Sequence, residues 1–389
     1  MRRIAVKDLR PGQKFDKPVY VDEESLFVPE GIEIREKDIR RLMDWDVAEV
    51  MTDGQVIGED PFQGKLPFFA NPFRSPAMKG IAGSYQDLSN SLLEIHGLIR
   101  TEQPVDPQQV KTIVDEVLRL LDEDPNNLVQ FILYGFQGEA GFAENAINST
   151  ILCALVGRKI KLQRHRLLNL ATAALLHDIG MLRIPEEIRN KEGKLSTEEL
   201  RVVRTHPIHS YKVITRELEF PEEVGLAALQ HQERFDGRGY PRGLAKEKII
   251  DLARIIAVVD SFEAMVSKRP YRDPMIGYTA MKNLLSDNGR RFDPEMLKVF
   301  IKALGLYPIG SIVLLNDGSI GRVLENDGEA PLKPTIKLLI ASDGTEYPQD
   351  DGEVIKLTER RDLFIAKAVD PYSLGDGDEQ DVQAASPGA

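Results

Sequence analysis

The chain has 389 residues, of which 42% are hydrophobic and 29% charged, and its formal net charge is −12. This composition is typical of a globular protein, and the acidic balance excludes a large binding surface for a nucleic-acid polymer, which requires dense Lys and Arg. The single cysteine, Cys153, excludes an internal disulfide and a cysteine-rich zinc site. We find no apolar run long enough for a membrane span and no apolar signal-peptide region after MRRIAVKDLRPGQ, so we expect a cytoplasmic protein.

Residues 1–58 predict a small β-rich module. Its β-forming segments alternate with turn dipeptides at Pro11-Gly12 and Asp53-Gly54. The expected strands lie within 4–9, 17–21 and 48–52, and a helix is expected at 35–44. The next stretch, 59–80, is rich in Pro, Gly, Phe and Asn, which predicts a connection packed against a domain.

Residues 81–304 predict a helical region. Apolar residues recur there at spacings of three and four, and prolines fall between the runs. The expected helices cover 88–99, 110–121, 128–136, 146–156, 166–176, 250–266 and 295–304. Ser196 followed by acidic residues predicts a further helix start. A plain helical bundle explains the leucines and alanines of this region but not its histidines.

From 306 to 370 the pattern changes to alternating β-formers around Asn316-Asp317-Gly318 and Asp343-Gly344, which predicts a small antiparallel β-module. The last residues, 371–389, are rich in Gly, Asp, Gln, Ala and Ser and predict a disordered tail. The expected fold class is therefore mainly α, a helical bundle flanked by small β-rich N-terminal and C-terminal modules.

The sequence LLHDIGMLRIP, residues 175–185, places His177 and Asp178 at the end of an apolar helix. A buried carboxylate needs compensation, and a metal ion is one form of it. Of the six histidines, His96 and His165 are expected to be ordinary solvated side chains, His165 in a basic loop. His206, His209 and His231 follow His177 within a short stretch, and His with carboxylates suits iron, manganese or zinc.

Asp260 adds a carboxylate from a distant helix. Helical spacing places it on the apolar face of 250–266, where an acid is usually paired with a cation or a metal. Asp251 and Glu263, by contrast, can face water.

Four motifs in order, HDIG at 177–180, HP at 206–207, DGRGYP at 236–241 and RPYR at 269–272, resemble the HD-GYP family over about residues 140–304. The flanking β-modules resemble its accessory domains. The resemblance implies a helical domain that binds divalent metal, iron or manganese, and hydrolyses cyclic di-GMP to pGpG or GMP. It implies His177 and Asp178 as catalytic residues. The implied metal ligands are His177, Asp178, His206, His231 and Asp260.

The resemblance also implies a substrate pocket lined by Gly239, Tyr240 and Pro241, with Arg269 and Arg272 holding phosphate. For the two arginines, surface ion pairs are the alternative. The family pattern gives His209 no role, and it is expected to be a polar helix residue. We expect Glu233 to orient His231 without binding the metal itself.

The sequence departs from the family pattern at four positions. Gly141 stands where three-metal members have a Glu, and Asn145 stands where the family has a His ligand. Met181 replaces a phosphate-binding Lys, and Gln232 replaces the second of two adjacent His ligands. The family pattern implies one ion held by Asn145, His177, Asp178 and Asp260, and another by Asp178, His206, His231 and Gln232. Each set keeps three strong ligands, and amide oxygens bind transition ions more weakly than imidazole.

We therefore expect a degenerate member that binds cyclic di-GMP or a protein partner, with one or two metal ions or none and with weak or absent hydrolysis. An active cyclic di-GMP phosphodiesterase is the alternative, and a phosphohydrolase acting on another nucleotide is a second one. A homodimer is also compatible with the sequence.

Overall fold

The computed structural model describes residues 2–6, 9, 14–15, 17–21, 26–28, 34, 36–45, 47–54, 56–57, 76–135, 141–191, 193–267, 274–347 and 351–369. The chain divides into two compact units, Met1–Phe68 with Pro371–Ala389, and Phe69–Asp370. The predicted tail, much of the predicted connection, and Arg269 and Arg272 lie outside the described residues. The predicted domain limits remain predictions.

The first unit is a small β-rich module with one described helix, α1 (Glu36–Asp44). Four antiparallel strands form a sheet in the order β1-β5-β3-β4, and two more pair separately. The strands are β1 (Arg2–Ala5), β2 (Lys14–Phe15), β3 (Val19–Tyr20), β4 (Leu26–Val28), β5 (Glu49–Thr52) and β6 (Val56–Ile57). Val19, Ile34, Leu42 and Val50 are fully buried and hold sheet and helix together.

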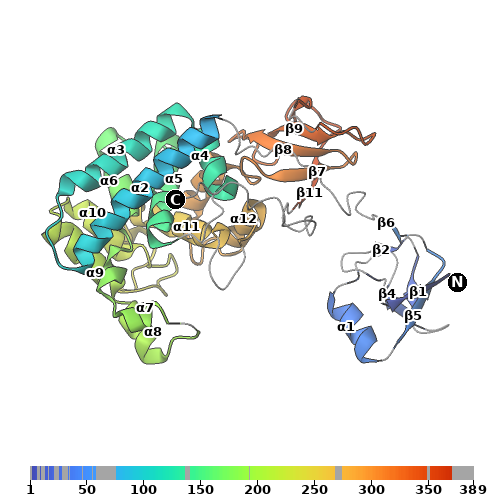
Figure 1. Cartoon of the computed structure of the whole chain (residues 1–389), viewed down its shortest axis with the longest axis horizontal. Coiled ribbons are helices and arrows are strands. Elements are labelled where there is room, and N and C mark those ends of the chain that lie inside the picture. Colours follow the sequence, from blue (N-terminus) through green and yellow to red (C-terminus); the bar gives the residue numbers. More distant parts are fainter. Residues whose placement is uncertain are drawn as a thin grey trace, which may run out of the picture. The chain divides into compact units, whose positions relative to one another are not determined.

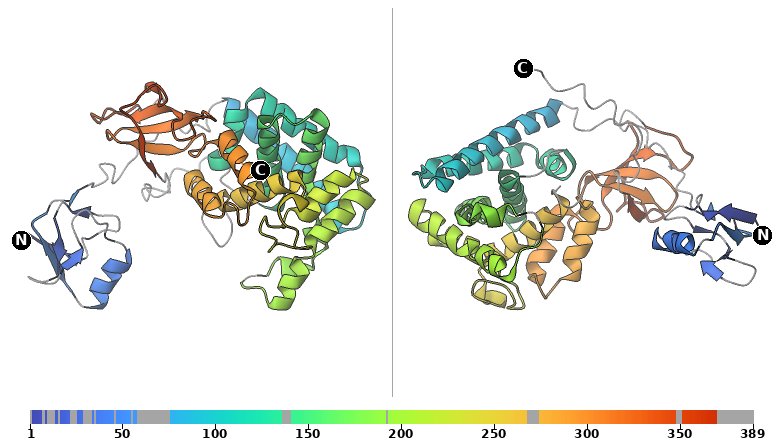
Figure 2. Two further views of the ribbon diagram at one scale, coloured as in Figure 1. Left: turned by 180° about the vertical axis from the view of Figure 1, so that it is seen from behind. Right: turned by 60° about the horizontal axis from the view of Figure 1, so that its bottom comes forward.

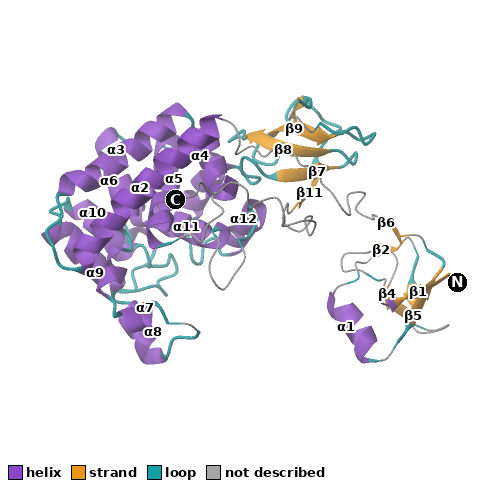
Figure 3. Cartoon of the chain, in the orientation of Figure 1, coloured by secondary structure: helices purple, strands orange, loops and turns teal. Residues whose placement is uncertain are grey.

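The second unit begins with helices, shown in Figures 1 and 3. They are α2 (Pro76–Arg100), α3 (Pro107–Glu123), α4 (Pro125–Gln130), α5 (Phe142–Lys159), α6 (Arg164–Leu176), α7 (Glu186–Arg189), α8 (Thr197–Val203), α9 (His206–Lys212), α10 (Glu222–Gln230), α11 (Asp251–Val266), α12 (Gly277–Ser286) and α13 (Pro294–Leu304). Short turns of other helix types occur at η3 (Phe131–Gly135), η4 (Ile179–Arg183), η5 (Val213–Glu217) and η6 (Lys246–Lys248). None of the described helices has the length and apolarity needed to cross a bilayer.

Helices α5 and α6 pack closely in the core of this bundle. Small side chains make the approach possible: Ala171, Ala173 and Ala174 of α6 are fully buried, and a Cβ at Gly157 of α5 would lie 2.7 Å from the side chain of Leu167. Helix α11 packs on α5 in turn. The ends of α6 and α10 and the middle of α11 thereby converge in one region.

A five-stranded antiparallel sheet completes the second unit, in the order β10-β9-β8-β7-β11. Its strands are β7 (Ile312–Leu315), β8 (Ile320–Glu325), β9 (Thr335–Ile340), β10 (Val354–Lys356) and β11 (Ile365–Val369). The predicted turn at Asn316-Asp317-Gly318 joins β7 to β8, and Gly318 adopts a φ of 87° that favours glycine.

Within the second unit this sheet lies next to the helices (Figure 2). Tyr307 stacks on Tyr278 of α12 with ring centroids 4.8 Å apart, and the hydroxyls of Tyr134 and Ser311 are 3.0 Å apart. The predicted fold class, mainly α with small antiparallel sheets at both ends, is confirmed.

Candidate metal centre

The centre of the site is the point where α6 ends and η4 begins. His177 follows the last residue of α6, and Asp178 precedes the first residue of η4. Gly180 lets this turn approach α9, because a Cβ there would lie 2.1 Å from the carbonyl oxygen of His206. The backbone N–H of Gly180 also donates to Ser210 Oγ at 2.9 Å. The glycine of HDIG therefore brings Asp178 next to His206.

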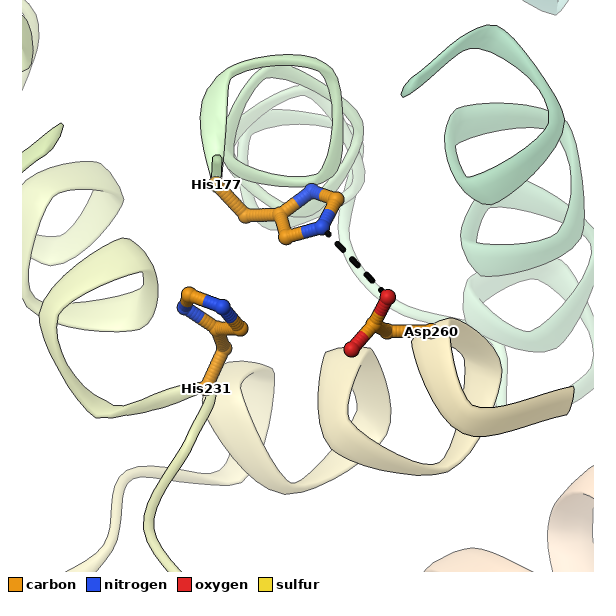
Figure 4. Close-up of side chains that lie close together, drawn as sticks. All are labelled: His177, His231 and Asp260. Atoms are coloured by element: carbon orange, nitrogen blue, oxygen red, sulfur yellow. Dashed lines mark ion pairs between the residues drawn. The ribbon is translucent and has the colours of Figure 1, made fainter. Parts of the chain in front are cut away.

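His231, at the end of α10, and Asp260, on α11, complete the group (Figure 4). Nε2 of His177 lies 3.7 Å from Asp260 Oδ1 and 3.6 Å from Asp178 Oδ2. Oδ1 of Asp178 lies 3.1 Å from Nε2 of His206 and 3.3 Å from Nε2 of His231. The histidine rings are buried, whereas the Asp178 side chain keeps 31% exposure, so solvent reaches the group through its carboxylates.

All three histidines are held in the same way. Each Nδ1 lies 2.7 or 2.8 Å from the backbone carbonyl three residues earlier, that of Ala174, Val203 or Ala228. A carbonyl oxygen only accepts hydrogen bonds, so each Nδ1 carries the hydrogen, and in the neutral ring each Nε2 presents a lone pair to the cluster. Oδ1 of Asp178 is buried and accepts no hydrogen bond among the described residues. Lone pairs thus converge on a shared space that lacks a donor, which is the arrangement of a cation site.

The pKa values of the cluster residues also indicate a cation site. Burial disfavours a charge on His177, but the carboxylates of Asp178 and Asp260 outweigh burial and raise its pKa to about 9. Burial lowers the pKa of His231, because the charged ring is poorly solvated there. Burial opposes ionisation of Asp178, yet the surrounding histidines hold its pKa well below its ordinary value. The cluster therefore demands positive charge, which a divalent cation would supply.

Two groups of three residues could each hold an ion, with ligand atoms within 4.8 Å of one another. One consists of His177, His231 and Asp260, and the other of Asp178, His206 and His231. The structure thus brings together all five residues proposed as ligands. It differs from the ligand sets implied by the sequence, where Asp178 is the shared residue, in that His231 belongs to both groups and Asp178 to one. Nitrogen and oxygen donors of this kind fit iron, manganese or zinc.

The four positions that depart from the family pattern lie in different surroundings. Gln232 is at the cluster, where its Nε2 donates to Asp260 Oδ2 at 3.5 Å. The Oδ1 of Asn145, on α5, is buried without a hydrogen-bond partner among the described residues. Met181 lies in η4, directly after HDIG, and offers no charge. Gly141 precedes the first residue of α5 and is exposed.

A polar cavity of about 250 Å³ opens beside the cluster and includes His231 and Asp260 in its wall. Four arginines border it: Arg204, Arg234, Arg238 and Arg291. Arg234 is paired with Asp236 at 2.9 Å. The other three have no ion-pair partner among the described residues. These arginines were not identified as site residues from the sequence. For Arg204, its position two residues before the HP motif could have indicated that it lies near the site.

Tyr240 contacts both Arg204 and His206. Its ring meets His206 edge-on with centroids 6.1 Å apart, and the guanidinium of Arg204 lies 5.4 Å from the ring centroid. Burial, together with the charges of Asp178 and Asp260, raises the pKa of Tyr240 to about 12. It is therefore a neutral hydroxyl at neutral pH, able to donate to a phosphate or a base.

The loop that carries Gly239, Tyr240 and Pro241 is fixed by tight contacts. A Cβ at Gly239 would lie 2.3 Å from the backbone nitrogen of Arg234, so only glycine fits. The expectation that Glu233 orients His231 is wrong. Its two oxygens accept the backbone N–H groups of Arg242 and Leu244 at 2.7 and 2.9 Å, while His231 is held by Ala228. Glu233 is buried because the loop offers it donors, and it shapes the pocket wall.

The expectation that Glu263 can face water is also wrong. Glu263 is 1% exposed, because it accepts hydrogen bonds from Asn148 Nδ2 at 3.2 Å and from Ser267 Oγ. Asn148 Oδ1 in turn accepts from the hydroxyl of Tyr85 on α2 at 2.8 Å. This buried network ties α2 to α5 and α11, one helical turn from Asn145 and Asp260.

The remaining predicted polar residues lie apart from the cluster. Asp251, expected to face water, is half-buried and paired with Arg166 at 2.8 Å. His165 is exposed as predicted but lies in the first turn of α6 and not in a loop. His96, expected to be solvated, is 6% exposed on α2 because its ring packs on Phe142. His209 is half-buried on α9 and belongs to neither ligand group.

Comparison with known proteins gives matches for both parts of the second unit. Residues 138–296 match the family described as "HD domain", and residues 312–377 match "KOW domain associated with HD domain". A cyclic di-GMP phosphodiesterase of Pseudomonas aeruginosa is 35% identical over 246 residues, which are 62% of this chain and 58% of that protein. A cyclic di-GMP phosphodiesterase of Borreliella burgdorferi is 26% identical over 367 residues, 92% of this chain and 95% of that protein.

A solved HDG"Y"P protein from Bdellovibrio bacteriovorus superposes with a TM-score of 0.48 at 16% identity, covering 77% of this chain and 97% of that chain. The matched region spans less than two thirds of the Pseudomonas protein's length.

Proposed function

Because this chain belongs to the HD-GYP family of HD domains, we propose that it binds cyclic di-GMP beside its histidine–aspartate cluster and that its metal-dependent phosphodiesterase activity is weak or absent. The observation that carries the proposal is the composition of the cluster. Five ligand residues converge there, but the amide of Gln232 already donates to Asp260, and Met181 stands where the family has a phosphate-binding lysine.

We propose that His177, Asp178, His206, His231 and Asp260 hold divalent metal, iron or manganese being the best candidates. The two groups of three share His231, whose single free nitrogen, Nε2, ligates one ion at a time. Metal bound there would supply Lewis-acid chemistry, polarising a phosphodiester oxygen and lowering the pKa of a water molecule. The hydrogen bonds from the Nδ1 atoms of the three histidines to backbone carbonyls keep the Nε2 atoms directed at the site before any ion binds.

The arginine cavity is the proposed phosphate-binding part of the site. Arg204, Arg238 and Arg291 supply positive charge next to Asp260, and guanidinium groups bind phosphate with two parallel hydrogen bonds. Tyr240 presents its neutral hydroxyl to the same space. Arg269 and Arg272 remain proposed phosphate contacts on the strength of the RPYR motif alone.

We expect weak hydrolysis because two metal-ligand positions and one phosphate contact lack the family residue. Each ligand group offers at most three strong ligands, and a neutral amide at 145 or 232 replaces an imidazole. Losses outside the first ligand shell already lower affinity or activity by about 10–100-fold, and these two changes lie in that shell by the family pattern. Met181 removes a charge-assisted hydrogen bond to phosphate, which contributes about 1.5–3 kcal/mol. Binding depends on the arginines and is less affected than turnover.

A direct test measures binding and turnover on the same preparation. The full chain, loaded with manganese or with iron, is incubated with labelled cyclic di-GMP, products are separated, and affinity is measured by equilibrium dialysis. We expect saturable binding with little or no pGpG or GMP. Rapid conversion of the dinucleotide, or no binding at all, contradicts the proposal. An Asp178→Asn variant is the matched control, since any product that it still forms comes from a contaminating enzyme.

An active cyclic di-GMP phosphodiesterase is the second candidate. It is favoured by the five intact ligand residues and by the relatives, which are cyclic di-GMP phosphodiesterases. The same incubation distinguishes it, because it requires multiple turnovers per chain. Contact with a signalling protein, or a homodimer, stays a prediction from the sequence.

A further inference from the structure

A second cavity, of about 310 Å³, borders η4 and shares no wall residue with the arginine cavity. Its wall combines apolar side chains, an aromatic ring and three basic residues, namely Leu93, His96, Arg100, Phe142, Met181 and Arg189. Its volume lies at the lower end of the range for small-molecule sites, about 300–1,000 Å³.

His96 is the feature of this wall that points to a ligand. The side chain is 6% exposed, and its Nε2 is buried without a hydrogen-bond partner among the described residues. Burial lowers the pKa of His96 to about 4, so the ring is neutral at neutral pH. A buried polar atom without a partner is unfavourable. A bound molecule that carries a hydrogen-bonding heteroatom would satisfy it.

The charges of the wall favour an anion. Arg100, in the last turn of α2, has no ion pair or hydrogen bond with any residue that the structure describes. Arg189 is held near the cavity by the carbonyl oxygen of Met181 at 3.4 Å, and its one carboxylate neighbour, Glu186, is 3.8 Å away and largely exposed. Two arginines therefore border the cavity with little compensating negative charge.

The apolar part of the wall suits a flat ring. The ring of Phe142 packs against His96 with centroids 5.0 Å apart, and the half-exposed side chain of Leu93 adds apolar surface to the wall. Met181 adds a flexible, polarisable side chain of the kind that adapts to ring systems. A ligand with a flat base and a phosphate matches this wall better than a bare anion does.

We propose that this cavity binds a nucleoside monophosphate, with the phosphate at Arg100 and Arg189 and the base between His96, Phe142 and Met181. The site is distinct from the metal centre, and only the choice of guanosine rests on the proposed function. It is connected to that centre by one short turn, since the backbone N–H of Met181 donates to the carbonyl oxygen of Asp178 at 2.8 Å. A nucleotide bound here would therefore be held against the turn that carries Asp178.

The test titrates the full chain with GMP, guanosine and inorganic phosphate, and follows the imidazole signals of its six histidines by ¹H–¹⁵N NMR. We expect GMP to shift the His96 signal and to bind at least about tenfold more tightly than phosphate or guanosine alone. His96→Phe, which keeps a flat ring of similar size, and Arg189→Gln should each weaken GMP binding about tenfold or more. Arg201→Gln, an exposed arginine outside both cavities, should have no effect.

Arg291→Gln separates this inference from the proposed function. GMP affinity that falls with Arg291→Gln but not with His96→Phe or Arg189→Gln would place the nucleotide in the arginine cavity and overturn the second site, leaving the proposed function intact. Binding of phosphate as tight as that of GMP, or no GMP binding, also overturns it. GMP binding that depends on His96 and Arg189 supports it even where cyclic di-GMP is neither bound nor hydrolysed.

Discussion

Nε2 of His206 lies 3.4 Å from Nε2 of His231, two ring nitrogens whose opposite Nδ1 atoms both donate to backbone carbonyls. In neutral rings these nitrogens present lone pairs to each other, which is unfavourable unless a cation or a proton lies between them. The close packing of α9 and α10 at this point is therefore favourable only when the site holds a cation or a proton.

The first prediction concerns metal content. His231 belongs to both proposed ligand groups, whereas His206 belongs to one. We expect His231→Gln to lower metal content more than His206→Gln does, because the first change removes a ligand from either group, whereas the second leaves His177, His231 and Asp260 intact. Elemental analysis after loading with manganese and extensive dialysis measures this. Equal metal content in the two variants would contradict the two-group arrangement.

The second prediction concerns the arginine cavity. Replacing Arg291 with Gln removes one charge that lies beside Asp260, and we expect the affinity for cyclic di-GMP to fall by about 10–100-fold, the usual effect of losing a charge-assisted hydrogen bond. The effect should shrink as salt rises, because screening weakens the interaction in both proteins. Isothermal titration calorimetry at two salt concentrations, with Arg201→Gln as control, measures the affinity for cyclic di-GMP. An unchanged affinity would remove Arg291 from the site.

The third prediction is a pH dependence of stability. Burial lowers the pKa of His96 from its ordinary 6.5 to about 4. Between these values the unfolded chain binds a proton that the folded chain does not, so stability rises with pH in this window and is fully present above it. From pH 7.5 to pH 5, wild type should lose about 2 kcal/mol that a His96→Phe variant keeps.

Urea unfolding of both proteins at the two pH values measures this difference. The carboxylates contribute equally to the pH dependence of both proteins, so their contribution cancels when the two are compared. A difference that does not change with pH would mean that His96 is protonated in the folded chain.

The fourth prediction concerns the network between α2 and α5. Tyr85→Phe keeps the ring on Phe131, whose centroid is 5.2 Å away, but removes the hydroxyl that donates to Asn148. The buried Asn148 oxygen then lacks this donor, and we expect a loss of about 1–3 kcal/mol in unfolding free energy. Tyr211→Phe, which removes an exposed hydroxyl bonded to Glu222, is the matched control and should have little effect. Equal thermal shifts in the two variants would show that the network contributes nothing.

Much of the fold could be predicted because local patterns agree with it. Apolar spacing predicted α2, α3, α5, α6, α11 and α13 but not α9, α10 or α12. The Asn-Asp-Gly turn predicted the joint between β7 and β8. The expectation that Asp260 points inward rested on helical spacing, and the structure places it 3.7 Å from His177.

Other features depend on partners that are distant in sequence. Glu263 is buried because Asn148, from another helix, donates to it, and no local pattern shows this. Glu233 is adjacent to His231 in the chain, yet it bonds to the loop after Pro241. Arg291 reaches the cavity because the carbonyl oxygens of Arg290 and Arg291 accept the N–H groups of Asp236 and Phe235 at 2.9 and 3.1 Å. Only the folded chain shows these relationships.

The most direct measurement compares cyclic di-GMP hydrolysis by wild type and by a variant in which the family residues are restored, Asn145→His, Met181→Lys and Gln232→His together. Both proteins are loaded with the same metal, and metal content is determined alongside the rate. We predict that the restored variant binds more metal and hydrolyses the dinucleotide at least about 100-fold faster than wild type, since the changes concern first-shell ligands and a phosphate contact. A wild type that holds two ions and turns over as fast as the restored variant would contradict the proposal of a weakened site.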